Sequence, residues 1–170
     1  LAFISPLTKL GYKVFLLAEE KNNYADVSRY LAGVIVPTVK ISDDAYLDYI
    51  LSVIRDNNVS VVIPMGDSSA EFISKHIDKL SSVVSIKMPD YETFLGGYDK
   101  NSLMALCKEQ GYPHPLTIDL SQISIEDSEL NEFPYPAILK PNFSTGGRGM
   151  KIINSYDELC ACYEGLRAQY

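Results

Sequence analysis

Apolar and polar positions in the first half of the chain alternate in blocks that predict strands and helices in turn. Residues 13–18 form an apolar run behind a segment that ends in Gly11, a common helix terminator, and residues 33–39 form a second run. Ser42 then precedes an apolar stripe at helical spacing, made by Leu47, Ile50, Leu51 and Ile54. The nearly continuous apolar run at residues 59–64 is typical of a parallel strand covered on both faces. This alternation predicts a doubly wound α/β layer.

The same pattern continues to about residue 95. Residues 68–71 fit a capping box with Ser68 at its start, and residues 83–87 fit one further short strand. The first part of the chain therefore reads as a small Rossmann-like domain with a parallel sheet. The glycine pair at 96–97 indicates a break, so we expect one domain at residues 1–95 and a second at residues 96–170.

The second domain is expected to open with a helix. Asp99 can cap it, and Gly111 can end it before two prolines that cannot continue it. The polar, acidic residues 121–132 read as a helix or as a solvated connector.

A lysine and a glycine-rich loop between two predicted strands are the most informative feature of the chain. Apolar and polar residues alternate up to Lys140, so that Ile138 and Lys140 share one face, and Pro141 biases Lys140 toward an extended conformation. The glycines of the loop permit positive φ values and a close approach of backbone N–H groups to an anion, and its polar side chains add donors. These residues are Ser144, Thr145, Gly146, Gly147, Arg148 and Gly149. Together they predict a clamp for phosphate groups.

The residues after the loop separate the possible phosphate-binding folds. A Walker loop and a dinucleotide-binding GxGxxG loop both lead into a helix. Residues 150–153 read instead as a strand, and a capping box at residues 155–158 opens a helix only afterwards. We therefore expect residues 143–149 to form a mobile loop between two antiparallel strands.

A strand lysine and a glycine hairpin in this order resemble the ATP-grasp family, closest to carboxylate-amine ligases of the carbamoyl phosphate synthetase type. The segment from Asp99 to Pro113 resembles the family's helix with a leading lysine. The resemblance implies a Rossmann-like pre-ATP-grasp domain followed by the first α+β lobe of an ATP-grasp domain. It also implies ATP and Mg²⁺ as cofactors, and a small carboxylate and an amine as substrates.

The resemblance also assigns roles to residues. Arg148 would be catalytic, reaching the γ-phosphate as the loop closes. Asp67 follows the carboxyl end of a predicted parallel strand, where open α/β sheets place their ligand sites, so we expect it to touch the acceptor substrate. The residues expected to bind the nucleotide are Lys100, Lys140, Ser144, Thr145, Gly146, Gly147 and Gly149. Plainer alternatives stay open: the glycine loop as an ordinary flexible turn, Lys140 as a surface strand lysine and Lys100 as an exposed helix lysine. Arg148 could be a solubilising turn residue, and Asp67 part of a helix cap made with Ser68.

Further parts of the family's site are expected outside this sequence. The resemblance places the Mg²⁺ ligands and the adenine-contacting hinge in a later subdomain, beyond Tyr170. We accordingly expect the 170-residue chain to fold but not to catalyse ligation. The first strand of the opening βαβ unit is missing before Leu1, so we expect the native chain to begin further upstream.

Composition limits the class of partner. The net charge of −7 argues against nucleic-acid binding through a broad basic surface. The sequence contains no membrane-length apolar run and no opening signal segment, so we expect a cytoplasmic protein without a membrane partner. The spacing of Cys160 and Cys162, and the isolation of His76 and His114, argue against a zinc site.

Two rival functions stay open at this point. A non-catalytic nucleotide-binding or regulatory module derived from the ATP-grasp fold would lack the downstream carboxylates of a ligase. A Rossmann-type oxidoreductase or sugar-nucleotide enzyme would need a GxGxxG loop, which this sequence does not contain.

Overall fold

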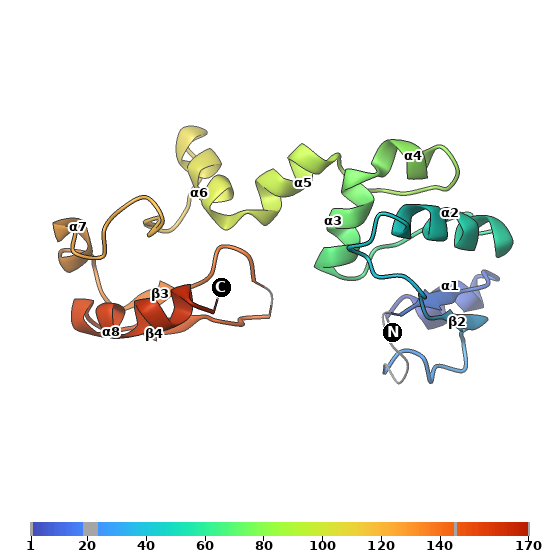
Figure 1. Ribbon diagram of the computed structural model, residues 1–170, viewed down its shortest axis with the longest axis horizontal. Helices are drawn as coiled ribbons and strands as arrows, with labels where there is room; N and C mark the ends of the chain where they lie inside the picture. Colours follow the sequence, from blue (N-terminus) through green and yellow to red (C-terminus); the bar gives the residue numbers. More distant parts are fainter. Residues whose placement is uncertain (1, 19–23, 145, 170) are drawn as a thin grey trace. The chain divides into compact units, whose positions relative to one another are not determined.

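The computed structural model describes residues 2–18, 24–144 and 146–169. They fall into two compact units, Leu1–Pro89 and Asp90–Tyr170, which are described separately (Figure 1). The fold is mixed α/β, with one small parallel sheet in the first unit and one small antiparallel sheet in the second.

The first unit follows the expected order of helices and strands up to α2, in shorter pieces, and the strands expected at residues 59–64 and 83–87 contribute only an isolated bridge between Val61 and Ser85. Two strands pair in parallel, with Phe15 opposite Gly33, and a side chain at Gly33 would come within 3.2 Å of the Phe15 ring. The elements are α1 (Ile4–Lys9), β1 (Phe15–Leu17), β2 (Gly33–Ile35), α2 (Tyr46–Asp56), α3 (Asp67–Lys75) and α4 (Ile77–Ser81).

The apolar stripe of α2 forms the core of the first unit, as its spacing predicts. Leu47 and Ile54 pack there with Ile73 of α3, Leu80 of α4 and Val84. The helix begins at Tyr46, four residues after Ser42, so Ser42 does not cap it.

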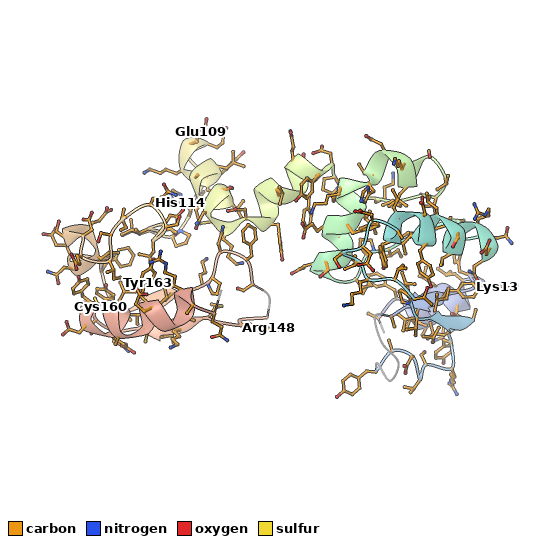
Figure 2. The ribbon with its side chains drawn as sticks, in the orientation of Figure 1. Lys13, Glu109, His114, Arg148, Cys160 and Tyr163 are labelled. Atoms are coloured by element: carbon orange, nitrogen blue, oxygen red, sulfur yellow. The ribbon has the colours of Figure 1, made fainter. Side chains whose placement is uncertain are left out.

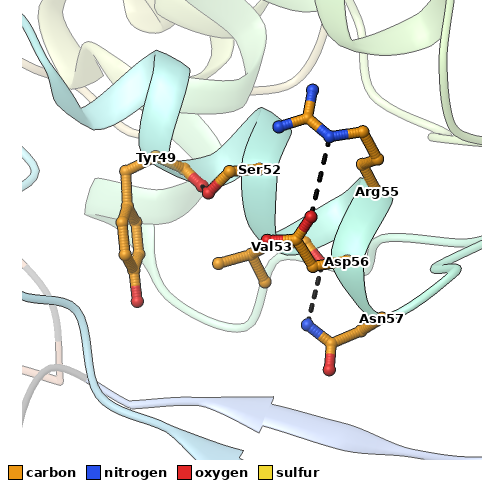
Figure 3. Close-up of polar contacts among 6 residues, drawn as sticks. All are labelled: Tyr49, Ser52, Val53, Arg55, Asp56 and Asn57. Carbon is orange, nitrogen blue, oxygen red and sulfur yellow. Dashed lines mark hydrogen bonds and ion pairs between the residues drawn. The ribbon is translucent and has the colours of Figure 1, made fainter.

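The end of α2 is closed by its own polar side chains (Figure 3). Asn57 Nδ2 donates to the Val53 carbonyl at 2.9 Å, and the left-handed Asn58 (φ 49°) turns the chain out of the helix. Arg55 Nε lies 3.6 Å from Asp56 Oδ1, and an ion pair this exposed contributes little to stability. Asn57 and Asn58 therefore end the helix.

The expectation of a strand at residues 59–64 is wrong. The run makes one isolated parallel bridge, between Val61 and Ser85, instead of a ladder. Val62 packs on the core, whereas Val61 and Ile63 are 50% and 45% exposed. An apolar run predicts a central strand only when both faces are covered, and here one side is open.

The expectation of a capping box that starts at Ser68 is also wrong. Helix α3 begins one residue earlier, at Asp67, with Gly66 as its N-cap. Ser69 Oγ accepts a hydrogen bond from the Gly66 N–H (3.2 Å) and donates one to the Gly66 carbonyl (2.7 Å). Ser69, at the third helical position, therefore satisfies the Gly66 N–H, which is the part that the predicted box gave to Glu71.

The second unit contains four helices and two strands among the residues described: α5 (Tyr91–Tyr98), α6 (Lys100–Glu109), α7 (Ser128–Asn131), β3 (Ala137–Leu139), β4 (Lys151–Ile153) and α8 (Tyr156–Arg167). The break expected at Gly96 and Gly97 is instead the last part of α5. This helix starts at a stronger signal, the Asp90 carboxylate, which accepts from the Thr93 N–H at 2.8 Å.

Strands β3 and β4 form an antiparallel hairpin with α8 packed against one face. Ile153, which is 1% exposed, packs in the core under that face with Leu130 of α7 and Leu159 of α8. Ser155 caps α8 through the Glu158 N–H (3.2 Å), as predicted, and the Glu158 carboxylate accepts from the Asn154 N–H (2.8 Å). Capping therefore sets the corner between β4 and α8.

Tyrosine hydroxyls fasten the irregular segment 118–132 to this core. Tyr135 donates to the Leu130 carbonyl (2.9 Å), and Tyr156 of α8 donates to the Ile125 carbonyl (2.9 Å). Apart from the single turn of α7, the acidic segment is a connector instead of a helix.

The two neighbouring isoleucines of β4 provide a test of this arrangement. Ile153→Ala removes a fully buried side chain and should lower the free energy of unfolding by about 2 to 5 kcal/mol. Ile152→Ala, at a position 67% exposed on the opposite face, should change it by less than about 0.5 kcal/mol. Chemical denaturation followed by circular dichroism measures both, and equal losses would contradict the assigned faces of β4.

Candidate functional site

The loop between β3 and β4 is the centre of the candidate site. Gly146, Gly147 and Gly149 have φ values of 61°, 76° and 71°, in the left-handed region that residues with side chains rarely adopt. The Met150 N–H closes a turn on the Gly147 carbonyl at 3.2 Å, and no helix begins in the described part of the loop. The predicted order of strand, glycine loop and strand is confirmed, which rules out a Walker or dinucleotide loop here.

One face of the hairpin is open and apolar. Ile138 and Ile152 stand directly opposite each other in the register and are 60% and 67% exposed. Continuing the strand alternation past Leu139 places Lys140 on the same face as Ile138. Lys140 is exposed, and among the residues that the structure describes its ammonium group has no hydrogen-bond or ion-pair partner. A cation thus stands free beside an apolar surface.

Lys100 reaches the same loop from the first turn of α6. Its Nζ donates to the main-chain carbonyls of Asn142, at 2.6 Å, and of Ser144, at 3.1 Å. An ammonium group has three N–H donors, so one remains for another acceptor. The structure therefore brings Lys100 and Ser144, both proposed from the sequence, to one place.

Asn142 belongs to the site and was missed by sequence reasoning. Its Oδ1 accepts from the Asn101 N–H at 3.0 Å, in the first turn of α6. The Ser102 N–H, with a smaller contribution from the Asn142 side chain, holds the pKa of Asp99 below its ordinary value. The neighbouring Phe143 ring lies 5.6 Å from the Tyr98 ring. No local pattern could reveal this contact, because it joins residues about forty positions apart.

Comparison with known proteins identifies this part of the chain. Residues 99–169 match the family model described as "Carbamoyl-phosphate synthase L chain, ATP binding domain". Residues 99–169 are an ATP-grasp segment. The match covers α6, the hairpin and α8, so it includes the hydrogen bonds of Lys100 and Asn142 described above.

Curated relatives of this chain are much longer than the chain itself. D-aspartate ligase of Enterococcus faecium is 27% identical over 113 residues, which are 65% of this chain and 24% of that protein. The carbamoyl phosphate synthase large chain of Deinococcus radiodurans is 27% identical over 106 residues, or 62% of this chain and 10% of the relative. The chain therefore spans a quarter or less of their length.

Solved structures share the fold over both units. The biotin carboxylase domain of Hydrogenobacter thermophilus 2-oxoglutarate carboxylase matches with a TM-score of 0.68 and 19% identity, covering 97% of this chain and 37% of that one. Biotin carboxylase of Campylobacter jejuni matches with a TM-score of 0.67 and 19% identity, covering 97% and 38%. Both chains thus contain a region that folds like the one described here.

The remaining side chains with an expected role in binding or catalysis are those of Arg148, Thr145 and Asp67. Arg148 lies exposed on the loop of the ATP-grasp segment, away from Cys160 and Tyr163 of α8 (Figure 2). Thr145 is outside the described residues. Asp67 is the first residue of α3, in the first unit, and its Oδ2 is buried without a hydrogen-bond partner among the described residues.

Neither a metal cluster nor a membrane span is found in the described parts of the chain. No three His, Cys, Asp or Glu side chains there are grouped so that they could hold a metal ion. Cys107, Cys160 and Cys162 are free and partly buried. None of the described helices has the length and apolar character needed to cross a membrane.

The cap of α6 gives a prediction with a defined pH dependence. Asp99 accepts from the Ser102 N–H at 2.8 Å, so Asp99→Ala should lower the free energy of unfolding by about 1 kcal/mol at neutral pH. Because folding lowers the pKa of Asp99, this stabilisation is complete above the unfolded-state value, roughly 3.9, and is lost as the pH falls further. Denaturation at a series of pH values measures the difference.

A matched control is Asp90→Ala, which removes the corresponding cap of α5. Hydrogen exchange should then accelerate in α5 and not in α6, whereas Asp99→Ala should accelerate it in α6. A difference between wild type and Asp99→Ala that stays constant down to pH 2 would contradict the role given to the ionised carboxylate.

Proposed function

We propose that this chain is the N-terminal part of an ATP-dependent ligase, which activates a carboxylate as an acyl phosphate for attack by an amine or a similar nucleophile. The observation that carries the proposal is Lys140, a cation without a described partner at the edge of an open apolar face, next to a loop of left-handed glycines. The segment that holds it matches an ATP-binding domain model.

The names of the relatives support the same class of reaction. They are a D-aspartate ligase and a carbamoyl phosphate synthase large chain. The Hydrogenobacter structure was determined with MgADP and bicarbonate, and the Campylobacter one is described as a β-γ-ATP complex. We propose ATP and Mg²⁺ as the cofactors, Leu1–Pro89 as the pre-ATP-grasp domain, and Asp90–Tyr170 as the first ATP-grasp lobe.

The open face of the hairpin fits a nucleotide in two parts. Ile138 and Ile152 offer exposed apolar surface against which a purine base can be desolvated, so they would form one wall of the base site. Lys140 would neutralise the phosphate chain at the edge of that surface. The ammonium of Lys100 retains one donor for a phosphate oxygen while it holds the loop.

The loop would supply the remaining contacts to the phosphates. Backbone N–H groups of left-handed glycines can approach an anion closely, as proposed for Gly146, Gly147 and Gly149, with Ser144 and Thr145 as further donors. Arg148, on the exposed part of the loop, would bind the γ-phosphoryl oxygens through its planar guanidinium. Its role would be to neutralise the charge of the group being transferred.

The reaction needs positioned charges instead of a side-chain nucleophile. A carboxylate oxygen attacks the γ-phosphorus, the bond to the bridging oxygen breaks, and ADP leaves with that electron pair. The amine then attacks the acyl carbon, inorganic phosphate leaves, and the nitrogen loses a proton. Mg²⁺ would add neutralisation of phosphate charge. The described residues contain no metal cluster, and we propose that its ligands lie beyond residue 170.

Asp67 would contact the acceptor substrate. Its Oδ2 is buried and has no partner within the described residues, and an unpaired buried carboxylate oxygen is costly unless something donates to it. The amino end of α3 already favours a negative charge there. A substrate ammonium or N–H group would satisfy the free oxygen. The setting that we propose for these reactions is the cytoplasm.

The phosphate role of Lys140 can be tested against a lysine on the other face of the hairpin. In a chain extended past Tyr170, Lys140→Ala should raise the Kd for ATP in the presence of Mg²⁺ roughly tenfold to a hundredfold, which corresponds to about 1.5 to 3 kcal/mol for a charged hydrogen bond. Lys151, paired with Leu139 on the face toward α8, is also exposed, and Lys151→Ala should leave the Kd within about twofold. Calorimetric titration measures both, and equal effects would remove Lys140 from the site.

Carboxylate-dependent ADP formation distinguishes a ligase from a binding module. The 170-residue chain should release no ADP with any pair of carboxylate and amine, while a chain extended past Tyr170 should do so with its own pair. In the extended chain, Asp67→Asn should raise the KM for an acceptor and leave the Kd for ATP unchanged. ADP formation by the short chain would mean that the metal site is misplaced, and an extended chain that only binds ATP would favour the module.

A further inference from the structure

The start of α6 and the hairpin loop are joined by a reciprocal contact, which we call the Asn142–Lys100 clasp. In one direction, Lys100 Nζ donates to the carbonyls of Asn142 (2.6 Å) and Ser144 (3.1 Å). In the other direction, Asn142 Oδ1 accepts from the Asn101 N–H (3.0 Å). Figure 1 shows the loop rising from the hairpin toward the corner between α5 and α6. Each segment thus contributes one side chain and one stretch of main chain.

The clasp orders groups that would otherwise be free. A lysine in the first turn of an exposed helix gains little by giving up its rotamer freedom, and it usually remains solvated. Here the Lys100 ammonium is instead held by two carbonyls separated by one residue, immediately before the glycines. The Asn101 N–H is one of the donors left without a helical acceptor at a helix start, and an amide oxygen from the loop satisfies it.

We propose that Asn142 is a positioning residue for nucleotide binding, an inference that rests on the proposed function. By holding the loop on the first turn of α6, Asn142 keeps the Ser144 carbonyl within reach of Lys100 and fixes the ammonium at the beginning of the glycine loop. Two N–H groups of Lys100 are used in the loop, and the third is kept for a phosphate oxygen. Asn142 itself touches no phosphate and acts through Lys100.

A neutral amide suits this place better than a carboxylate. The Asp99 carboxylate already lies beside Asn142, whose side chain is among the causes that lower the pKa of Asp99 after the stronger Ser102 N–H. A second carboxylate there would repel the first and would compete with phosphate for the Lys100 ammonium. The amide oxygen accepts the same hydrogen bond without either effect.

The test is a double-mutant cycle on ATP binding. In calorimetric titrations with ATP and Mg²⁺, Asn142→Ala should raise the Kd about fivefold to tenfold, the range for one neutral hydrogen bond, and Lys100→Ala should raise it at least as much. If Asn142 acts through Lys100, the double variant should bind like Lys100→Ala alone, within about twofold. Asn131→Ala, an exposed asparagine of α7, is the matched control and should bind like wild type.

A second measurement needs no nucleotide. Trypsin cleavage after the exposed Arg148 reports how firmly the loop is held, and Asn142→Ala should accelerate it several-fold. Asn131→Ala, at an exposed position of α7 outside the clasp, should be cleaved at the wild-type rate, and an unchanged far-UV circular dichroism spectrum of Asn142→Ala controls for a general loss of folding. Mass spectrometry identifies the cut and its rate.

The outcomes separate this inference from the proposed function. If wild type binds no ATP, or Lys140→Ala binds as well as wild type, the proposed function fails and this inference fails with it. If both of those results are as expected but Asn142→Ala binds ATP like Asn131→Ala, only the positioning role is overturned. Multiplicative effects of Lys100→Ala and Asn142→Ala would equally overturn it, since the two residues would then act independently. Faster cleavage with an unchanged Kd would make the clasp structural only.

Discussion

The hydrogen bonds from Lys100 to the carbonyls of the hairpin loop are the interaction on which the rest of the candidate site depends. Without them, the loop would be attached to α6 by the Asn142 side chain alone, and three left-handed glycines within four residues would sample many conformations. With them, the loop starts at a fixed place on α6. The helix has its own fixed start, because Asp99 caps it. The Asp99 cap, the Lys100 ammonium group and the hairpin loop are therefore linked through the first turn of α6.

The hairpin has one buried face and one open face. Side chains alternate across a strand, so Ile153 is buried under α8 while Ile152, its neighbour, remains open. The same alternation gives the open face Ile138 and Lys140. Two facing exposed isoleucines beside a lysine without a described partner offer a ligand both apolar surface and positive charge. This pairing of apolar surface and charge is what supports the proposal of a nucleotide site there.

Much of this site could be predicted from the sequence because its signals are local. The strand lysine, the glycines, and the caps at Asp99 and Ser155 all depend on residues within a few positions of each other. The strand expected at residues 59–64 was wrong because an apolar run does not reveal how many of its faces are covered, and Val61 is half exposed. Asn142 was missed because its partner is distant in sequence, and an asparagine in a loop usually serves its own turn.

Amide hydrogen exchange with and without ATP and Mg²⁺ tests the central claim most directly, because it locates the nucleotide without assuming any residue's role. At saturating nucleotide, the account predicts slower exchange in residues 137–153 and in the first turn of α6, with α2 and α4 unchanged. Saturating ATP that leaves residues 137–153 unprotected, or that protects only elements of Leu1–Pro89, would contradict it.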